Sequence, residues 1–432
     1  MIILEMTRRE CEIFSQNVSR SQFWVRYGAV VLTLTLFMPT AMSSSKGLLV
    51  VIGVCMAVCG ILYMETVSYQ SVVSTFHAVF NAPECRPCLE QTNIVFIKVH
   101  KAGGSTVSTI FQRFGDDRNL SFVLPRKGIN LGWPNQIKRR DFLPSLTGEY
   151  NILVRHVVYN RRILPGIMAK NTVYIAILRE PFSHLKSVFN FFNIAQKLKI
   201  RSKDPVLKFL NSPRRYAKKR GGQKTKNFMS FDLGFPVNRL SGNRKAISDF
   251  IRLTDKDFLL VIILEYLDES LVLLKRYLCW SLSDILYWVQ NQRKYKRKDV
   301  RISLAQRKTH RKFSNVDYAY YEYFNATLWK KIELQGPDFW KEAQHFKAIK
   351  SDVMEFCQSP QSVVNTRVIN ASMWNEEFYV DAAFCAKLMT GTLSYLNFFR
   401  KKYSLQQNSK DSVGHNSTKK KSHCFPGTNK FP

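Results

Sequence analysis

The sequence predicts an α/β protein with a mostly parallel central sheet flanked by helices, preceded by one transmembrane helix. From residue 92 onward, apolar strand-like runs alternate with helix-like runs, which is the pattern of a parallel sheet covered by helices. Near the N-terminus, Gly47–Met64 carries no charged residue and is long enough to cross a bilayer as a helix. The chain has 432 residues, of which 45% are hydrophobic, so it can bury a sizeable core.

Four apolar runs predict the strands of the sheet, and they are Asn93–Val99, Tyr150–Val158, Thr172–Glu180 and Phe258–Tyr266. A helix is expected to follow the first strand through Phe114. A second helix is expected to begin at Pro181, because proline suits the first turn of a helix. A third is expected over Asp268–Leu278. A ligand site is expected where these strands end and these helices begin.

The remaining segments complete the predicted folded domain, residues 92–405. Lys199–Lys226 is basic and interrupted by prolines and glycines, so we interpret it as a loop or lid. From Ser281 onward the pattern is rich in helices. Residues 406–432 are polar and basic, and they are expected to form a disordered tail.

The predicted anchor sets the orientation of the chain. Basic residues lie before Gly47–Met64, and none follows before Arg86. The positive-inside rule therefore places residues 1–46 in the cytosol, makes residues 65–91 a stem, and puts the folded domain on the lumenal side of the membrane. Two alternatives stay open: the apolar run Tyr27–Met42 is a second span, or Met42 is the true start of the protein.

Sequons and cysteines agree with a lumenal domain. Four Asn-X-Ser/Thr sequons follow the anchor, at Asn119, Asn325, Asn370 and Asn416, and they are candidate glycosylation sites. Six cysteines also follow it, an even number that suits disulfides of undetermined pairing in an oxidising compartment: Cys85, Cys88, Cys279, Cys357, Cys385 and Cys424. We interpret Cys85 and Cys88 as structural rather than as a redox pair, because no βαβ pattern surrounds them.

The turn after the first strand is the strongest candidate for a binding site. It reads "HKAGGST" and leads into a predicted helix, whose first N–H groups attract anions. Gly103 and Gly104 let the backbone approach an anion, Ser105 and Thr106 add hydroxyl groups, and Lys101 adds a positive charge. The pattern indicates a phosphate cradle. Because Lys101 precedes both glycines, it is not a Walker loop, and an ordinary glycine turn is the alternative.

Further stretches of the sequence carry a resemblance to a known family. "HKAGGST" resembles the 5′-phosphosulfate-binding loop of Golgi sulfotransferases, and "ILREPFSHLKSVFNFF" resembles their 3′-phosphate-binding segment. Three more blocks resemble the galactose-3-O-sulfotransferases, the branch that includes galactosylceramide sulfotransferase, and they are Asn227–Gly234, Glu265–Trp288 and Tyr323–Trp329. The resemblance runs from about Asn93 to Leu405. It implies a P-loop NTPase-like sulfotransferase fold.

The resemblance also implies a reaction and a location. The expected enzyme transfers a sulfuryl group from 3′-phosphoadenosine 5′-phosphosulfate (PAPS) to the 3-hydroxyl of a terminal galactose on a glycolipid or glycoprotein, and it releases 3′-phosphoadenosine 5′-phosphate (PAP). The protein is expected to be a single-pass type II protein of the Golgi membrane, and no metal is expected. The net charge of +33 suits an anionic donor, whereas nucleic-acid binding conflicts with the anchor and the sequons.

Each site residue receives its role from this resemblance. Lys101 is expected to stabilise the charge that develops on the bridging oxygen of the donor. The cradle is expected to hold the 5′-phosphate through its backbone and side chains. It consists of Lys101, Ala102, Gly103, Gly104, Ser105 and Thr106. Arg179 and Ser187 are expected to bind the 3′-phosphate, and the alternative for Arg179 is an ion pair with Glu180.

The general base is expected to be a histidine. His156 lies where related O-sulfotransferases carry their catalytic histidine, and His100 is the reserve candidate. His184 stands where many Golgi sulfotransferases have a second arginine. Asp232 and Glu265 have either a sugar-binding or a structural role. A related sulfotransferase for another sugar position and an inactive binding homologue are the alternatives to the expected enzyme.

Overall fold

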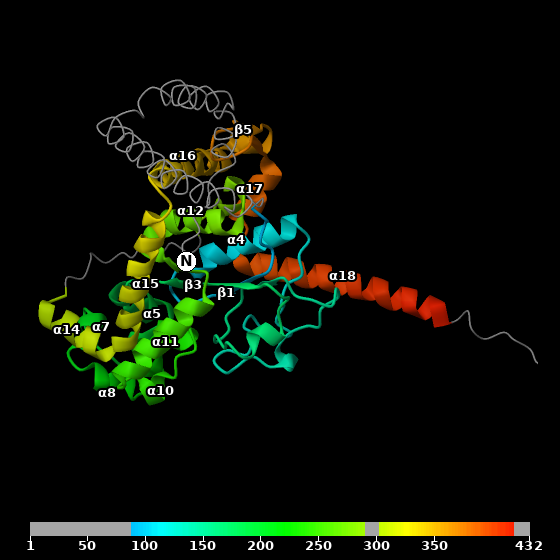
Figure 1. Cartoon of the computed structure of the whole chain (residues 1–432). Helices are drawn as coiled ribbons and strands as arrows, with labels where there is room; N and C mark the ends of the chain where they lie inside the picture. The colour runs from blue at the N-terminus through cyan, green and yellow to red at the C-terminus, as the bar shows by residue number, and fades with distance from the viewer. Residues whose placement is uncertain (1–87, 290–301, 419–432) are drawn as a thin grey trace, which may run out of the picture. The chain divides into compact units, whose positions relative to one another are not determined.

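The computed structural model describes residues 88–289 and 302–418 (Figure 1). The chain divides into two compact units, Met1–Cys88 and Leu89–Pro432, and the second unit is described below. The predicted anchor, the alternative span Tyr27–Met42 and most of the stem lie outside the described residues. Within those residues, no helix combines the length and the apolar character that a membrane crossing requires.

A four-stranded parallel sheet forms the centre of this unit. The strands are β1 (Ile94–Ile97), β2 (Ile152–Leu153), β3 (Val173–Leu178) and β4 (Leu260–Ile263), in the order β2-β1-β3-β4. In the register of the sheet, Phe96 pairs with Ile175 and Ile177 pairs with Ile262. The strand residues are nearly all buried, as expected for a parallel sheet with both faces covered. The α/β class and the parallel sheet are confirmed, and every predicted strand is present in a shorter form.

Helices cover both faces of the sheet (Figure 1). On one face lie α4 (Gly104–Asp117), α12 (Leu267–Leu278), α13 (Leu282–Ile285) and the start of α18 (Thr392–Thr418). On the other lie α5 (Pro181–Phe191), α9 (Phe228–Asp232), α11 (Arg244–Asp257) and α15 (Asn315–Glu333). The predicted helices after β1, β3 and β4 are therefore confirmed. Short elements connect them, namely η1 (Arg139–Asp141), η2 (Leu164–Gly166), α10 (Val237–Leu240) and η4 (Leu264–Tyr266).

The segment predicted as a loop or lid is instead helical. It contains α7 (Pro205–Leu210), α8 (Pro213–Ala217) and η3 (Gly222–Thr225). The prolines that suggested a loop begin helices, because proline fits the first helical position, and Asp204 caps α7 by accepting from Leu207 N. Together with α6 (Ile194–Lys197) and α14 (Leu304–Phe313), these helices enclose a second small core built around Phe189, Phe209 and Phe313.

The C-terminal part forms a further layer against α12. It consists of α16 (Asp338–Gln358), η5 (Pro360–Val363), the hairpin β5 (Arg367–Ile369) and β6 (Phe378–Val380), and α17 (Ala382–Met389). The sequence patterns did not predict this hairpin. A disulfide between Cys357 and Cys385 joins α16 to α17. Cys88 and Cys279 each take part in a disulfide as well.

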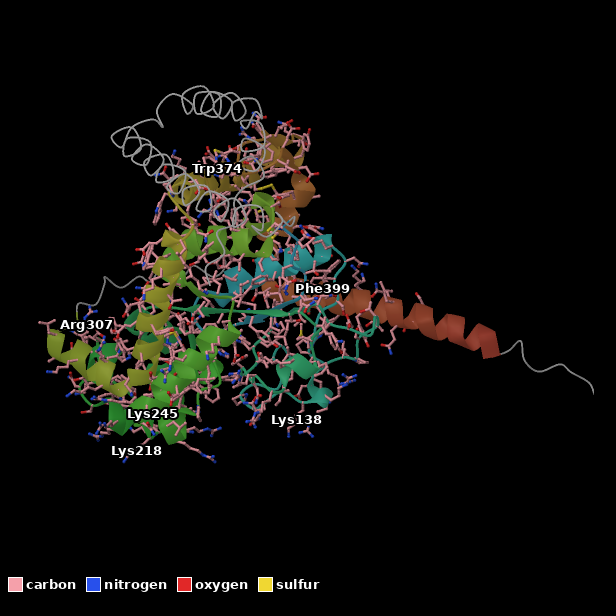
Figure 2. The ribbon with its side chains drawn as sticks, viewed as in Figure 1. Lys138, Lys218, Lys245, Arg307, Trp374 and Phe399 are labelled. Carbon is pink, nitrogen blue, oxygen red and sulfur yellow. A yellow bond between two sulfur atoms is a disulfide. The ribbon has the colours of Figure 1, made fainter. Side chains whose placement is uncertain are left out.

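The last helix extends further than the sequence predicted. α18 runs through Thr418, past residue 405, where a disordered tail was expected. Its continuation has a simple cause, since residues 406–413 contain neither proline nor glycine. Phe399 anchors the helix by stacking on Phe122, with ring centroids 4.1 Å apart (Figure 2).

Much of the positive charge faces solvent. Lys138, Lys218, Lys245 and Arg307 are exposed and point outward from the folded unit (Figure 2). Lys218 follows α8, so the basic segment around it presents charge to solvent although its apolar residues are buried.

Candidate active site

The turn between β1 and α4 has the backbone of an anion cradle. Gly103 has a φ of +84°, and a Cβ built there would lie 2.4 Å from Leu264 Cδ1. A Cβ at Gly104 would lie 2.9 Å from Lys98 Cγ. Gly103 therefore favours glycine for its conformation, and a side chain at either position would have to displace Leu264 or Lys98. The turn delivers the N-terminus of the 14-residue helix α4, whose first N–H groups and dipole favour an anion.

Arg179 lies beside this turn. It follows β3, the neighbour of β1 in the sheet, and its Nη1 donates to the carbonyl oxygen of Lys101 at 3.3 Å. Glu180 is occupied elsewhere, because its carboxylate accepts from Phe182 N and Ser183 N and caps α5. The alternative of an Arg179–Glu180 ion pair is therefore not seen. Ser187 is buried in α5, two turns after the cap.

Lys101 connects the turn with the far end of α5. Its φ is +60°, and its Nζ lies 3.8 Å from the centroid of the Phe191 ring. The ammonium group is half-buried and sits on the side of the turn that faces the C-terminal end of α5.

Two histidines stack beside the cradle. The rings of His100 and His156 lie 3.7 Å apart at an angle of 12°. His156 Nδ1 is 2.7 Å from the carbonyl oxygen of Lys98, and because a carbonyl only accepts, Nδ1 carries the hydrogen and Nε2 carries the lone pair. Burial, assisted by nearby His100 and Lys98, holds the pKa of His156 well below its usual value. His156 is thus a neutral imidazole with its lone pair at Nε2.

Asp232 fixes the position of His100. Its Oδ2 accepts from the backbone N–H of His100 at 2.7 Å and lies 2.8 Å from His100 Nδ1. Its Oδ1 accepts from Trp133 Nε1 at 2.8 Å. The carboxylate is 1% exposed, so these contacts occupy it fully. Asp232 therefore orients His100 and Trp133. Sequence spacing could not reveal either of these two partners.

His184 and Glu265 have structural contacts. His184 Nε2 donates to the carbonyl oxygen of His100 at 2.9 Å, and burial lowers the pKa of His184 to about 3. This histidine is neutral and does not replace the positive charge of the second arginine found in many Golgi sulfotransferases. Glu265 Oε1 accepts from Glu180 N at 2.9 Å and so ties the end of β4 to the start of α5.

Two buried cations lie beneath the cradle, and the sequence patterns did not single them out. Lys98 and Arg155 are each 5% exposed, and both donate to Thr392 Oγ1 at the start of α18. No carboxylate within residues 88–289 and 302–418 pairs with either of them. Burial lowers the pKa of Lys98 to about 7 and that of Arg155 to about 10. The interior end of the cradle therefore has a positive field without a compensating acid.

A cavity of about 390 Å³ lies on the Arg179 side of the site. It opens between the start of α5 and the helices α14 and α15, and its lining includes Glu180, Tyr318, Arg307, Lys308 and Arg311. In the part of the chain that the structure describes, no group of three or more His, Cys, Asp or Glu side chains is placed to hold a metal ion.

The sequons differ in accessibility. Asn119 and Asn370 are exposed, directly after α4 and β5. Asn325 is half-buried within α15, and its Oδ1 is a buried acceptor without a hydrogen bond. Asn416 lies near the end of α18. These positions favour Asn119 and Asn370 as carriers of a glycan.

Comparison with known proteins assigns the family. The model of the family described as galactose-3-O-sulfotransferase matches residues 32–374, which is most of the chain. The chain belongs to the galactose-3-O-sulfotransferase family. Among its relatives, human galactosylceramide sulfotransferase is 33% identical over 266 residues, which cover 59% of this chain and 60% of the relative.

Other members of the galactose-3-O-sulfotransferase family are similarly distant. Human galactose-3-O-sulfotransferase 2 is 32% identical over 62% of this chain and 68% of its own length. Bovine galactose-3-O-sulfotransferase 3 is 30% identical over 64% of this chain and 66% of its own length. The match to galactosylceramide sulfotransferase thus spans about 60% of that relative.

Proposed function

We propose that this protein transfers the sulfuryl group of PAPS to the 3-hydroxyl of a terminal galactose. The observation that carries the proposal is the glycine cradle between β1 and α4, hydrogen-bonded to Arg179 and adjacent to the neutral base His156. The family and the names of its members support a sulfotransferase that acts on galactose.

The donor site follows from the cradle and Arg179. The N–H groups at the start of α4, with the hydroxyl groups of Ser105 and Thr106, would hold the 5′-phosphate, and the left-handed conformation of Gly103 shapes the turn that presents them. Arg179 and Ser187 would hold the 3′-phosphate. In the neighbouring cavity, Arg307 and Lys308 would add positive charge for an anionic nucleotide, whereas Arg311 is paired with Glu322. Bound PAPS supplies an activated sulfuryl group.

The transfer needs a base and a stabilising cation. His156 accepts the proton of the sugar 3-hydroxyl at Nε2, while the sugar oxygen forms a bond to sulfur. The bond from sulfur to the bridging oxygen breaks, and the ammonium group of Lys101 stabilises the charge that remains on PAP. The products are the 3-sulfated sugar, PAP and a proton on His156. Asp232 maintains the geometry by holding His100, on which His156 stacks.

The proposal includes the setting of the enzyme. Gly47–Met64 would anchor it as a type II protein of the Golgi membrane, with residues 89–418 in the lumen. Asn119 and Asn370 would carry glycans there, since both are exposed. Galactosylceramide, lactosylceramide and N-acetyllactosamine are the acceptors to compare.

The test combines donor binding with transfer of radiolabelled sulfate from PAPS to these acceptors. His156→Ala is expected to lose at least about 100-fold in kcat while its affinity for PAP stays within twofold, because only the base is removed. Arg179→Ala is expected to weaken PAP binding about tenfold or more, the contribution of a charged hydrogen bond. His345→Ala is the matched control, because His345 bonds to Asn375 on the hairpin side of the domain.

Two results would contradict the proposal. Absence of PAP binding by the wild-type protein would refute the donor. Near-normal turnover by a folded His156→Ala protein would refute the assigned base, and the same measurement on His100→Ala would then decide whether the other stacked imidazole acts instead.

A further inference from the structure

An aromatic cluster surrounds the stacked histidines. Trp133, Phe192 and Phe228 form what we call the aromatic cage. The centroid of the His100 ring lies 4.4 Å from that of Trp133, 5.2 Å from that of Phe228 and 6.4 Å from that of Phe192. The three residues come from separate segments: the loop before η1, the end of α5 and the start of α9. Trp133 and Phe192 are partly exposed, whereas Phe228 is buried.

A lysine lies over the cage. Lys224 Nζ is 4.5 Å from the ring centroid of Phe192, 4.6 Å from that of Trp133 and 5.4 Å from that of Phe228. Burial, assisted by the charge of Lys197, lowers the pKa of Lys224. Lys224 belongs to η3, in the segment that the sequence suggested was a loop. The cage therefore combines apolar ring faces with a hydrogen-bond donor, which is a chemistry suited to a ligand with both characters.

The cage has a fixed relation to the proposed base. The two oxygens of Asp232 bind Trp133 Nε1 and His100, and His100 stacks on His156. On the opposite side, Phe192 is the neighbour of Phe191, the ring that Lys101 contacts. The cage thus lies next to His156 and Lys101, the two residues that would act on the reacting atoms. It is on the side of the turn that faces the end of α5.

We propose that the aromatic cage is the sugar-binding subsite of the acceptor, a proposal that rests on the proposed function. A galactose ring has one face made of C–H groups at C3, C4 and C5, because its 4-hydroxyl is axial on the other face. Such C–H groups pack on the electron-rich faces of aromatic rings. The sugar ring takes the place of Lys224 Nζ over Trp133 and Phe192, the displaced Lys224 donates to sugar oxygens, and the 3-hydroxyl at the edge of the apolar patch faces His156. A glucose ring lacks this continuous C–H face, so the cage also favours galactose over its 4-epimer.

The test separates acceptor binding from donor binding and folding. Phe192→Ala is expected to raise the acceptor KM at least tenfold, with the affinity for PAP within twofold of wild type and little change in Tm. Trp133→Phe keeps a ring but removes the bond to Asp232, so it is expected to raise KM less than Trp133→Ala. Lys224→Met is expected to raise the acceptor KM. Lys224→Arg keeps the positive charge and is expected to leave the acceptor KM close to the wild-type value. Trp340→Ala and Phe398→Ala are the controls, because both remove an exposed aromatic side chain that does not belong to the cage.

A binding measurement without turnover completes the test. Methyl β-galactoside is titrated into the PAP-loaded protein while tryptophan fluorescence is followed, and methyl β-glucoside serves as the comparison. Saturable binding that Phe192→Ala weakens supports the subsite. If the folded cage variants keep the wild-type KM, or lose PAP affinity as strongly as acceptor affinity, the subsite is refuted although the proposed function stands. If the wild-type protein binds no PAP, the proposed function fails and this inference fails with it.

Discussion

Gly103 shows how a single residue determines the candidate site. Its φ of +84° belongs to the left-handed region, and the missing side chain leaves room for Leu264. Leu264 follows β4, so the cradle is shaped by a strand that lies two places away in the sheet. Gly103, which looks like a simple turn glycine, is in this way packed against Leu264.

Gly103→Ala is therefore expected to lower the free energy of unfolding by about 2 kcal/mol, since an L-residue in this conformation costs about 1–2 kcal/mol and Leu264 must also move. PAP affinity is expected to fall as well. Gly148→Ala is the matched control, because Gly148 has a φ of +92° but no neighbour within 4 Å. Chemical denaturation measures both variants. An equal loss in both would show that the contact with Leu264 has no effect.

At the residue level, the sequence predicted the cradle but not its surroundings. The glycines, Lys101 and Arg179 lie in local patterns that can be read along the chain. His100 and Asp232 are 132 positions apart, and Lys98 and Thr392 are 294 apart, so no local pattern could pair them. Trp133 lies in an irregular loop and carries no motif, and only its contact with Asp232 reveals its place.

At the level of elements, Glu342 joins two helices. It lies on α16 and is 1% exposed, and its carboxylate accepts from Lys275 Nζ at 2.8 Å and Arg276 Nε at 2.6 Å, both on α12. Because α12 packs on β4, this junction attaches the C-terminal layer to the sheet.

The strands of the sheet could be predicted because buried parallel strands are continuous apolar runs, whereas the short hairpin β5–β6 has exposed residues and no such signal.

Glu342→Gln is expected to lower the free energy of unfolding by about 3 kcal/mol, because it removes the charge partner of the partly buried Lys275 and leaves Arg276 paired with Asp338 alone. Asp249→Asn is the comparison. Asp249 pairs with Lys245 and Arg252 on the surface of α11, so its loss is expected to change stability little. Thermal melting of both variants checks the difference. A Glu342→Gln protein as stable as Asp249→Asn would contradict this view of the junction.

At the level of the whole molecule, buried neutral histidines make stability depend on pH. His310 is 1% exposed and lies 3.0 Å from Tyr318 OH, and burial lowers its pKa to about 4 although Glu180 acts in the opposite direction. His184 has a pKa of about 3 for the same main reason. At these two positions the unfolded chain, with ordinary histidine pKa values near 6.5, binds more protons than the folded one between about pH 6.5 and 4.

These two histidines are therefore expected to lower stability as the pH drops below 6.5, and Asp317, whose pKa burial raises to about 6, opposes this loss below pH 6. Above pH 7 stability is expected to rise further, because burial lowers the pKa of Lys98 to about 7 and the unfolded chain keeps that proton up to a higher pH. His310→Gln is expected to reduce the slope below pH 6.5, because glutamine can still bond to Tyr318 and does not titrate. Melting curves between pH 5 and 8 make the comparison. The same slope in wild type and variant would mean that His310 does not contribute.

The attachment of α18 has a consequence for how the protein is made. Lys98 and Arg155 both donate to Thr392, although Arg155 also donates to the carbonyl oxygen of Ile129, and Phe399 closes the contact with Phe122. A ribosome that has finished the sheet has therefore not yet delivered Thr392, the acceptor that these two cations share. The nascent chain completes the end of the sheet beneath the turn between β1 and α4 last, so a release or stall before residue 392 would leave that end unfinished in an otherwise nearly full-length product.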